Sequence, residues 1–194
     1  MKKKVAIGVL ILIPFVSILL VIMFRGVIMP NNEEIIDNLK NIDNYETDVM
    51  YISKNHKSEE VEKTKQFYNK DTGVKVEFED GITKVYTKEN ISVKDNLSNI
   101  EYEISSDMDI LHPLAFLNNI LSMPVKTDSL KEAQEEWGDT LYIQFDVELF
   151  LDNSHLDNAR VYVDKEEMIP IGVVVYNDQG EDTVRIIYNN FKKS

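Results

Sequence analysis

The sequence predicts an α+β protein with one membrane-spanning helix at its N-terminus, followed by a domain built mainly from antiparallel strands. Two observations lead to this prediction. Residues 5–24 form a run of twenty residues without a charge. Beyond residue 44, apolar and polar residues alternate in several short segments, which are separated by turns rich in Asp, Asn and Gly. Such alternation is typical of strands that have one face in water.

The predicted membrane anchor begins at Val5 and ends at Phe24, and a basic tip, residues 1–4, precedes it. A helix rises about 1.5 Å per residue, so this run reaches roughly the 30 Å thickness of the hydrocarbon core of a bilayer. Pro14 in its middle is compatible with a membrane helix. No small-x-small cleavage motif follows the run, and the chain has no cysteine for lipid attachment. We therefore expect the helix to be retained.

The charges beside this helix predict its orientation. Three lysines precede it, and a single arginine, Arg25, follows it. Because positive residues favour the cytoplasmic side, we expect the N-terminus in the cytoplasm and the rest of the chain outside the cell membrane. Residues 25–33 then form a linker, and residues 34–194 form one extracytoplasmic domain.

The composition of the outer domain restricts its function. Four of the 21 basic residues and none of the 34 acidic residues lie in residues 1–30, so the remaining chain carries 17 basic and 34 acidic residues, a formal charge of −17. Such a charge repels phosphate backbones, which argues against nucleic-acid binding. Because the chain contains no cysteine, its stability does not depend on disulfides.

Helical spacing returns directly after the predicted linker. The segment Pro30-Asn31-Asn32 offers an N-cap, and Glu33 and Glu34 suit the positive end of a helix dipole. A helix of two to three turns is expected here. Its apolar stripe consists of Ile35, Ile36, Leu39 and Ile42.

Most of the remaining chain is predicted to form strands joined by hairpins. Alternation is clearest at residues 74–79 and 141–148, and turn sequences such as Asp80-Gly81 separate the segments. With the weaker segments included, we expect a sheet of about eight to ten strands. The weaker segments are residues 45–54, 60–70, 82–88, 98–105, 159–165, 169–176 and 183–191.

A second helical segment interrupts these strands. Residues 114–123 are apolar at helical spacing, with Pro113 at their start and Pro124 at their end. Because they are apolar on more than one face, we expect them to pack inside a curved sheet. Residues 128–137 fit either a helix or an edge strand, and the sequence leaves this choice open.

The last third of the domain resembles a known family. A strand ends at Asp164, the next strand starts at Pro170, a polar turn contains Gly180, and the final strand closes with Asn190-Phe191. This pattern resembles the lipoprotein-carrier proteins of the LolA and LolB type. The resemblance implies a LolA-like fold, an incomplete antiparallel β-barrel with helices on its concave face.

A narrower resemblance is to the GerS-like germination proteins of clostridial spore formers. It rests on the lysine-led export segment, the size, the acidic balance and residues 135–143, Glu-Glu-Trp-Gly-Asp-Thr-Leu-Tyr-Ile. It implies a forespore or spore-envelope location. It also implies a partnership with an exported N-acetylmuramoyl-L-alanine amidase, a zinc enzyme that modifies spore-cortex peptidoglycan. Such proteins are typically lipoproteins, and this chain departs from them because it has no cysteine to acylate.

Residues with the pattern of a catalytic or metal site are sparse. The three histidines lie in separate segments, outside any metal-binding motif. Asp107, Asp109 and His112 could converge on a metal, but acids at a helix N-terminus beside a surface histidine explain them better. Residues 177–182 superficially resemble a calcium loop, yet a hairpin turn fits them better. We therefore predict no catalytic residue, metal or cofactor.

Three functions fit these features. The favoured one is a membrane-tethered, non-catalytic module that binds and activates an exported amidase in spore-cortex modification and germination, as the GerS-like resemblance implies. The alternative is the binding or sensing of a lipid or acyl chain in the half-barrel, as the LolA resemblance implies. A glycan-cleaving enzyme with two carboxylates is the third, although the sequence shows no motif for it.

Trp137, beside Gly138 at the entrance of a strand, is the predicted partner contact. Aromatic residues are enriched at the centres of protein interfaces. The alternative for Trp137 is a place in the core.

Overall fold

The structure, a computed structural model, describes residues 14–21, 30–54 and 58–193. The chain divides into two units, Met1–Ile35 and Ile36–Ser194. In the first unit, residues 14–21 are helical. No helix among the described residues has both the length and the apolar character needed to cross a membrane. Most of the predicted anchor, including Val5 and Phe24, lies outside the described residues, so the anchor stays a prediction.

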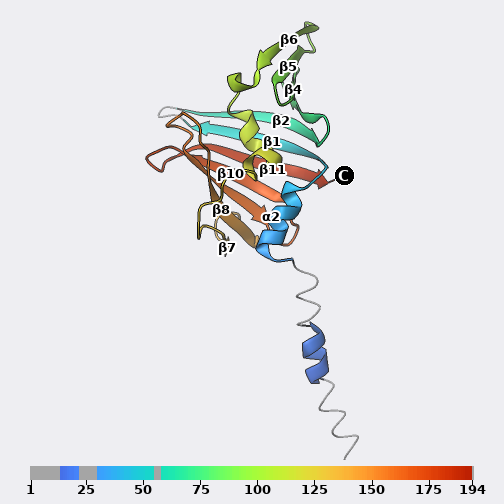
Figure 1. Cartoon of the computed structure of the whole chain (residues 1–194), viewed down its shortest axis with the longest axis vertical. Helices are drawn as coiled ribbons and strands as arrows, with labels where there is room; N and C mark the ends of the chain where they lie inside the picture. Colours follow the sequence, from blue (N-terminus) through green and yellow to red (C-terminus); the bar gives the residue numbers. More distant parts are fainter. Residues whose placement is uncertain (1–13, 22–29, 55–57, 194) are drawn as a thin grey trace, which may run out of the picture. The chain divides into compact units, whose positions relative to one another are not determined.

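Helix α2 (Asn32–Lys40) begins as the sequence predicts (Figure 1). The backbone N–H of Glu34 donates to Oδ1 of Asn31 (2.8 Å), and the backbone N–H of Asn31 donates to Oε2 of Glu34 (3.0 Å). This reciprocal pair is a capping box, which satisfies backbone donors that a helix start leaves without intrahelical partners. Leu39, near the end of α2, is buried.

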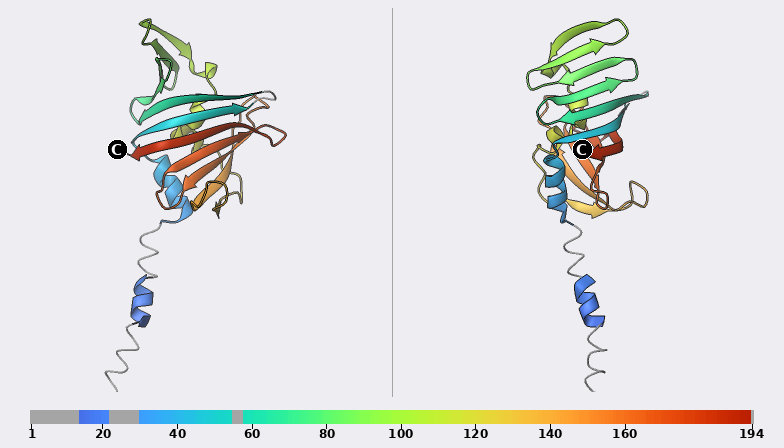
Figure 2. Two further views of the ribbon diagram at one scale, coloured as in Figure 1. Left: turned by 180° about the vertical axis from the view of Figure 1, so that it is seen from behind. Right: turned by 90° about the vertical axis from the view of Figure 1, so that its right-hand side faces the viewer.

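The second unit is built on one antiparallel sheet of eleven strands (Figure 1). Their order is β6-β5-β4-β3-β2-β1-β11-β10-β9-β8-β7. The sheet is curved (Figure 2). It is also open, because β6 and β7 at its two ends each pair with one strand in the described part of the chain. The strands are β1 (Asn44–Lys54), β2 (Glu59–Asn69), β3 (Gly73–Phe78), β4 (Ile82–Tyr86), β5 (Asn90–Asp95), β6 (Ile100–Ser105), β7 (Lys131–Ala133), β8 (Tyr142–Glu148), β9 (Asn158–Asp164), β10 (Pro170–Tyr176) and β11 (Asp182–Lys193).

The predicted curved antiparallel sheet is therefore confirmed, with two additions. Strand β5 was not predicted, and the ambiguous segment 128–137 contains the short strand β7. The predicted turn at Asp80-Gly81 joins β3 to β4. Gly81 has a φ of +89°, a conformation that glycine adopts without steric cost.

Two short helical segments replace the single helix predicted over residues 114–123. They are η2 (His112–Ala115) and α3 (Leu117–Ile120). The helix is interrupted because Phe116 between them has an extended backbone, with φ −83° and ψ 116°. We call residues 112–120 the plug. Its buried apolar side chains are Leu114, Ala115, Phe116, Leu117 and Ile120.

The plug lies against one face of the sheet. Viewed from behind, the strands lie in front of it (Figure 2). The hydroxyl of Tyr188 on β11 donates to the carbonyl oxygen of Ala115 (2.9 Å), and the backbone N–H of Leu117 donates to the hydroxyl of Tyr45 on β1 (3.3 Å). The central strands thus hold the plug through buried tyrosine hydroxyls as well as through apolar packing.

Candidate functional site

The two ends of the open sheet differ in how well they are protected. Strand β7 has three residues, and the carboxylate of Glu132 within it lies 2.5 Å from Nζ of Lys165. Short, charged edge strands resist further pairing. Strand β6 has six residues, five of them exposed. Because it pairs only with β5 in the described part of the chain, about half of its backbone N–H and C=O groups point outward.

The apolar side chains of β6 continue the core face of the sheet beyond its last paired strand. The register sets Tyr102 opposite Val93 and Ile104 opposite Ile91. Val93 and Ile91 belong to a buried cluster, whereas Tyr102 is 52% exposed. The difference arises because Tyr102 has a neighbouring strand on one side only. A strand added beyond β6 would cover it.

More exposed apolar side chains flank β6. Of the eight large hydrophobic side chains that are exposed in the described part of the second unit, five lie within residues 97–110. Single exposed hydrophobic residues are ordinary, but neighbouring ones, such as Ile100 and Tyr102 on one face of β6, mark a candidate interaction site. We call these five residues the β6 surface. They are Leu97, Ile100, Tyr102, Met108 and Ile110.

The opposite face of β6 is acidic. Glu101 and Glu103 alternate with the apolar residues of the strand. Nζ of Lys94 lies 2.5 Å from the carboxylate of Glu101, and the side-chain amide of Asn90 donates to Glu103 (3.2 Å). The edge therefore shows an apolar row on one face and a row of carboxylates on the other.

A buried polar cluster fixes the segment that follows β6. Oδ2 of Asp109 accepts hydrogen bonds from Nζ of Lys84 (2.7 Å) and from the hydroxyl of Tyr86 (2.7 Å). Nδ1 of His112 lies 2.8 Å from the same oxygen, and Nε2 of His112 lies 3.0 Å from Oε2 of Glu62. These contacts connect the segment between β6 and the plug to strands β2 and β4.

The charge of Asp109 depends on these partners. Burial raises the pKa of its carboxyl, but the hydrogen bonds from His112 and Lys84 outweigh burial and hold this pKa well below its usual range. Burial, together with the hydrogen bond to Asp109, raises the pKa of the Tyr86 hydroxyl. Asp109 is thus an ionised carboxylate inside the protein, held by neighbours that stabilise its charge.

The sequence-based interpretation of this segment was wrong in one respect. His112 is buried rather than a surface residue, with a side chain only 10% exposed. Asp107 lies exposed in η1 (Ser106–Met108). Over residues 14–21, 30–54 and 58–193, no group of three or more His, Asp or Glu residues is arranged to hold a metal ion. The spacing of Asp109 and His112 hinted at a pair, but Lys84 and Glu62 are too distant in the sequence to be found by spacing.

Trp137, the predicted partner contact, lies at the other end of the sheet. Its ring packs edge-on against Tyr162 (5.3 Å between centroids) and sits over Gly172, where an added Cβ would come within 3.0 Å of it. Gly172 and Val173 are neighbours on β10 and therefore face opposite sides of the sheet. Val173 pairs with Ile186 on the side that the plug covers. Trp137 therefore covers the opposite face. It is partly buried, and its role as a partner contact stays a prediction.

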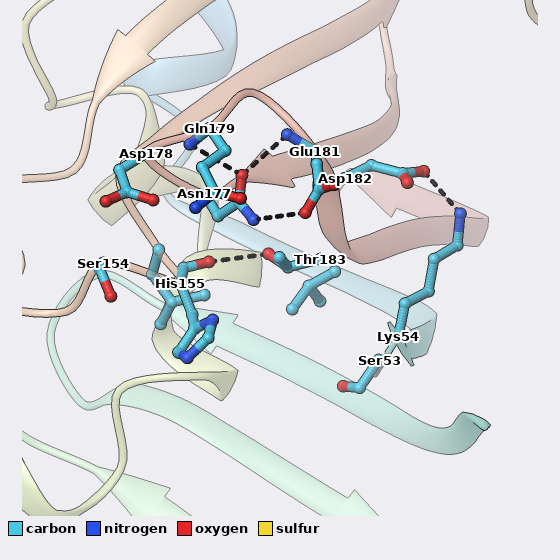
Figure 3. A pocket seen from close by; sticks show the side chains of 12 residues that line it. Ser53, Lys54, Ser154, His155, Asn177, Asp178, Gln179, Glu181, Asp182 and Thr183 are labelled. Atoms are coloured by element: carbon cyan, nitrogen blue, oxygen red, sulfur yellow. Dashed lines mark hydrogen bonds and ion pairs between the residues drawn. The ribbon is translucent and has the colours of Figure 1, made fainter. Parts of the chain in front are cut away.

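A cavity of about 740 Å³ lies beside the hairpin that joins β10 to β11 (Figure 3). Oδ1 of Asn177 accepts hydrogen bonds from the backbone N–H groups of Gln179 (3.0 Å) and Glu181 (2.8 Å). Nζ of Lys54 lies 2.6 Å from Asp182. Residues 177–182 thus form the hairpin turn that the sequence favoured over a calcium loop, and these polar groups stabilise the turn itself.

Comparisons with known proteins place this fold. No curated protein matches the sequence. An uncharacterized conserved protein from Thermus thermophilus matches with a TM-score of 0.54 and 13% identity, over 84% of this chain and 86% of the other. The GerS lipoprotein, solved in complex with the CwlD amidase from Clostridioides difficile, matches with a TM-score of 0.50 and 17% identity, over 85% of this chain and 97% of the other. At these identities the likeness shows a common fold.

A LolA superfamily protein from Nitrosomonas europaea also matches, with a TM-score of 0.41 and 10% identity, over 85% of this chain and 94% of the other. The predicted closeness of the fold to that of GerS is confirmed. Residues 2–194 match the model of the family described as "Sporulation protein YdcC-like". The chain is therefore a member of the YdcC-like family of sporulation proteins.

Proposed function

We propose that this protein is a non-catalytic binding module that binds an exported N-acetylmuramoyl-L-alanine amidase and raises its activity during spore-cortex modification and germination. The observation that carries the proposal is the exposed apolar β6 surface, on a fold shared with a protein that was solved in complex with an amidase. Membership of a sporulation family agrees with this setting.

The buried polar cluster supports a structural rather than a catalytic role. The carboxylate of Asp109 is occupied by Lys84, Tyr86 and His112, all within 3 Å. A general base needs an oxygen that can reach a substrate, and these bonds take up the accepting capacity of this carboxylate.

The plug weakens the alternative of lipid binding. In the LolA-type alternative, a lipid would lie against the face of the sheet that carries Tyr45 and Tyr188. Here the protein's own residues 114–117 bond to those tyrosines and are buried there. The space is filled by side chains, which favours recognition of a protein partner at the edge over sequestration of a lipid on the face.

A membrane tether through residues 5–24 belongs to the same proposal, with residues 34–194 in the forespore or spore envelope. We expect the full-length chain to stay with the membrane fraction after alkaline carbonate washing and to begin at or near Met1. A mature N-terminus between Arg25 and Asn32 would contradict the tether, while the binding function could still hold.

The binding function is tested with the full-length chain and the sporulation amidase of the same bacterium, produced together. We expect the two proteins to co-purify and the amidase to release more peptide from purified peptidoglycan when the chain is present. Equal amidase activity with and without the chain would refute the proposal, and so would hydrolysis of peptidoglycan by the chain alone.

A further inference from the structure

We propose that β6 binds an extended segment of the partner as an added strand, and that this segment carries apolar side chains on one face and basic side chains on the other. This inference rests on the proposed function, because it names the surface and the mode by which the amidase is held. Strand addition is a common way to recognise an extended segment.

The backbone of β6 supplies the first argument. Strand β6 is the end of the sheet, in green in Figure 1, and its six residues pair with β5 alone in the described part of the chain. A strand of this length presents roughly three outward N–H groups and three outward C=O groups. The opposite edge, β7, is too short to offer a comparable ladder.

The side chains on the core face supply the second argument. Ile100 and Tyr102 project on the same face as the buried Val93 of β5, yet both are more than half exposed. An added strand would set its own side chains beside them and complete the packing that the sheet leaves open. Apolar residues at alternate positions of the partner strand are required for this.

The carboxylates on the other face of β6 indicate which side chains the added strand carries between its apolar positions. Glu101 and Glu103 would lie directly beside those side chains of an added strand that project on the same face of the sheet as the glutamates. Opposite charges at such cross-strand positions are stabilising and like charges are destabilising. Lysine or arginine in the partner therefore fits, and the acidic excess of this chain, 34 acidic against 21 basic residues, favours a basic partner segment as well.

The same charges argue against a second copy of this chain as the occupant. Antiparallel pairing of two β6 strands with Tyr102 opposite Tyr102 sets Glu101 of each copy opposite Glu103 of the other. That arrangement brings like charges together at the edge. The geometry therefore points to a different chain with basic residues.

The experiment measures the affinity of the purified amidase for the full-length chain and for three variants. Tyr102→Lys places a charge in the apolar row, and Glu103→Lys reverses the charge on the other face. Val61→Lys is the matched control, because Val61 is 56% exposed, similar to Tyr102, but lies on β2, four strands away from β6 in the sheet. We expect Tyr102→Lys to weaken binding by about tenfold or more. For Glu103→Lys we expect a smaller loss that shrinks at high salt, and Val61→Lys should stay within about twofold of the wild type.

Hydrogen exchange adds a readout that separates strand addition from side-chain contact. Amides of residues 100–105 that exchange freely in the chain alone should become protected when the amidase binds.

Binding of the wild type without such protection, or equal losses of affinity for Tyr102→Lys and Val61→Lys, would overturn strand addition while the amidase-binding function stands. A wild type that does not bind the amidase at all would refute the function itself. A homodimer that Tyr102→Lys abolishes would assign the edge to a second copy and overturn this inference.

Discussion

Replacing Asp109 by asparagine removes the charge at the centre of the buried cluster and keeps the size of the side chain. In the wild type, its carboxylate accepts from Lys84 and Tyr86 at 2.7 Å each and contacts His112 at 2.8 Å. Its side chain is 7% exposed, against 20% for Lys84. The variant therefore leaves a nearly buried ammonium group without its counter-charge.

The expected cost follows from these exposures. Removing one partner of a buried ion pair costs about 3 to 5 kcal/mol. The lower end applies here, because Lys84 can reach some water and asparagine still offers an oxygen to the Tyr86 hydroxyl. We expect a loss of about 3 kcal/mol, which for a domain of this size lowers the melting temperature by about 6 to 12 °C.

The assay is thermal and urea unfolding of the full-length chain, followed by the fluorescence of Trp137, the only tryptophan. Asp107→Asn is the matched control, since Asp107 is exposed two residues earlier. It should change the free energy of unfolding by less than about 0.5 kcal/mol. A loss below about 1 kcal/mol for Asp109→Asn would refute the assigned role of the cluster.

The pH dependence gives a second check with a defined sign. The pKa of Asp109 is lower in the folded chain than its ordinary value of 3.8. Its stabilisation is therefore fully present above about pH 4 and is lost as the pH falls through the lower pKa of the folded state. The asparagine variant cannot lose this contribution, so the two stability curves should converge below pH 4. Curves that diverge in that range would contradict the argument.

Three further substitutions test the packing described above, each by urea unfolding followed by circular dichroism. Gly172→Ala should destabilise the fold by about 2 kcal/mol, because the new Cβ would lie 2.6 Å from the carbonyl oxygen of Ile186; an unchanged midpoint would contradict this. Phe150→Asn should add about 0.5 kcal/mol, because Phe150 has a φ of +45° and is exposed; a loss of stability would show that its ring packs on the fold. Trp137→Ala removes the ring that packs on Tyr162 and should cost about 2 kcal/mol. Full amidase affinity in this folded variant would argue against Trp137 as a partner contact.

The local features of the fold could be predicted from the sequence because each depends on neighbouring residues. The capping box of Asn31 and Glu34 and the glycine turn at Gly81 are set within a few positions of the chain. The alternation of residues 74–79 and 141–148 likewise predicted strands that the structure contains as β3 and β8.

Features that depend on distant neighbours could not be predicted. Strand β5 has only two buried apolar residues, Ile91 and Val93, which is too weak a pattern to stand out. His112 is buried because Lys84, Tyr86 and Glu62, from other parts of the chain, share its cluster. The exposed edge at β6 could not be predicted either, because Tyr102 alternates with glutamates just as it would in a strand with two neighbours. The order of strands in the sheet decides which strand lies at its edge.

The pairing of β1 with β11 affects the order in which the chain acquires its structure during synthesis. Strands β1 to β6 follow one another through hairpins, as do β7 to β11, so each half can pair locally. The joint between the halves pairs Tyr45 with Lys193 and Ser53 with Val184, and it needs the last strand. Until those residues emerge, β1 and β10 remain open edges that are vulnerable to proteases and to aggregation. The final twelve-residue strand therefore determines when the domain becomes resistant to both.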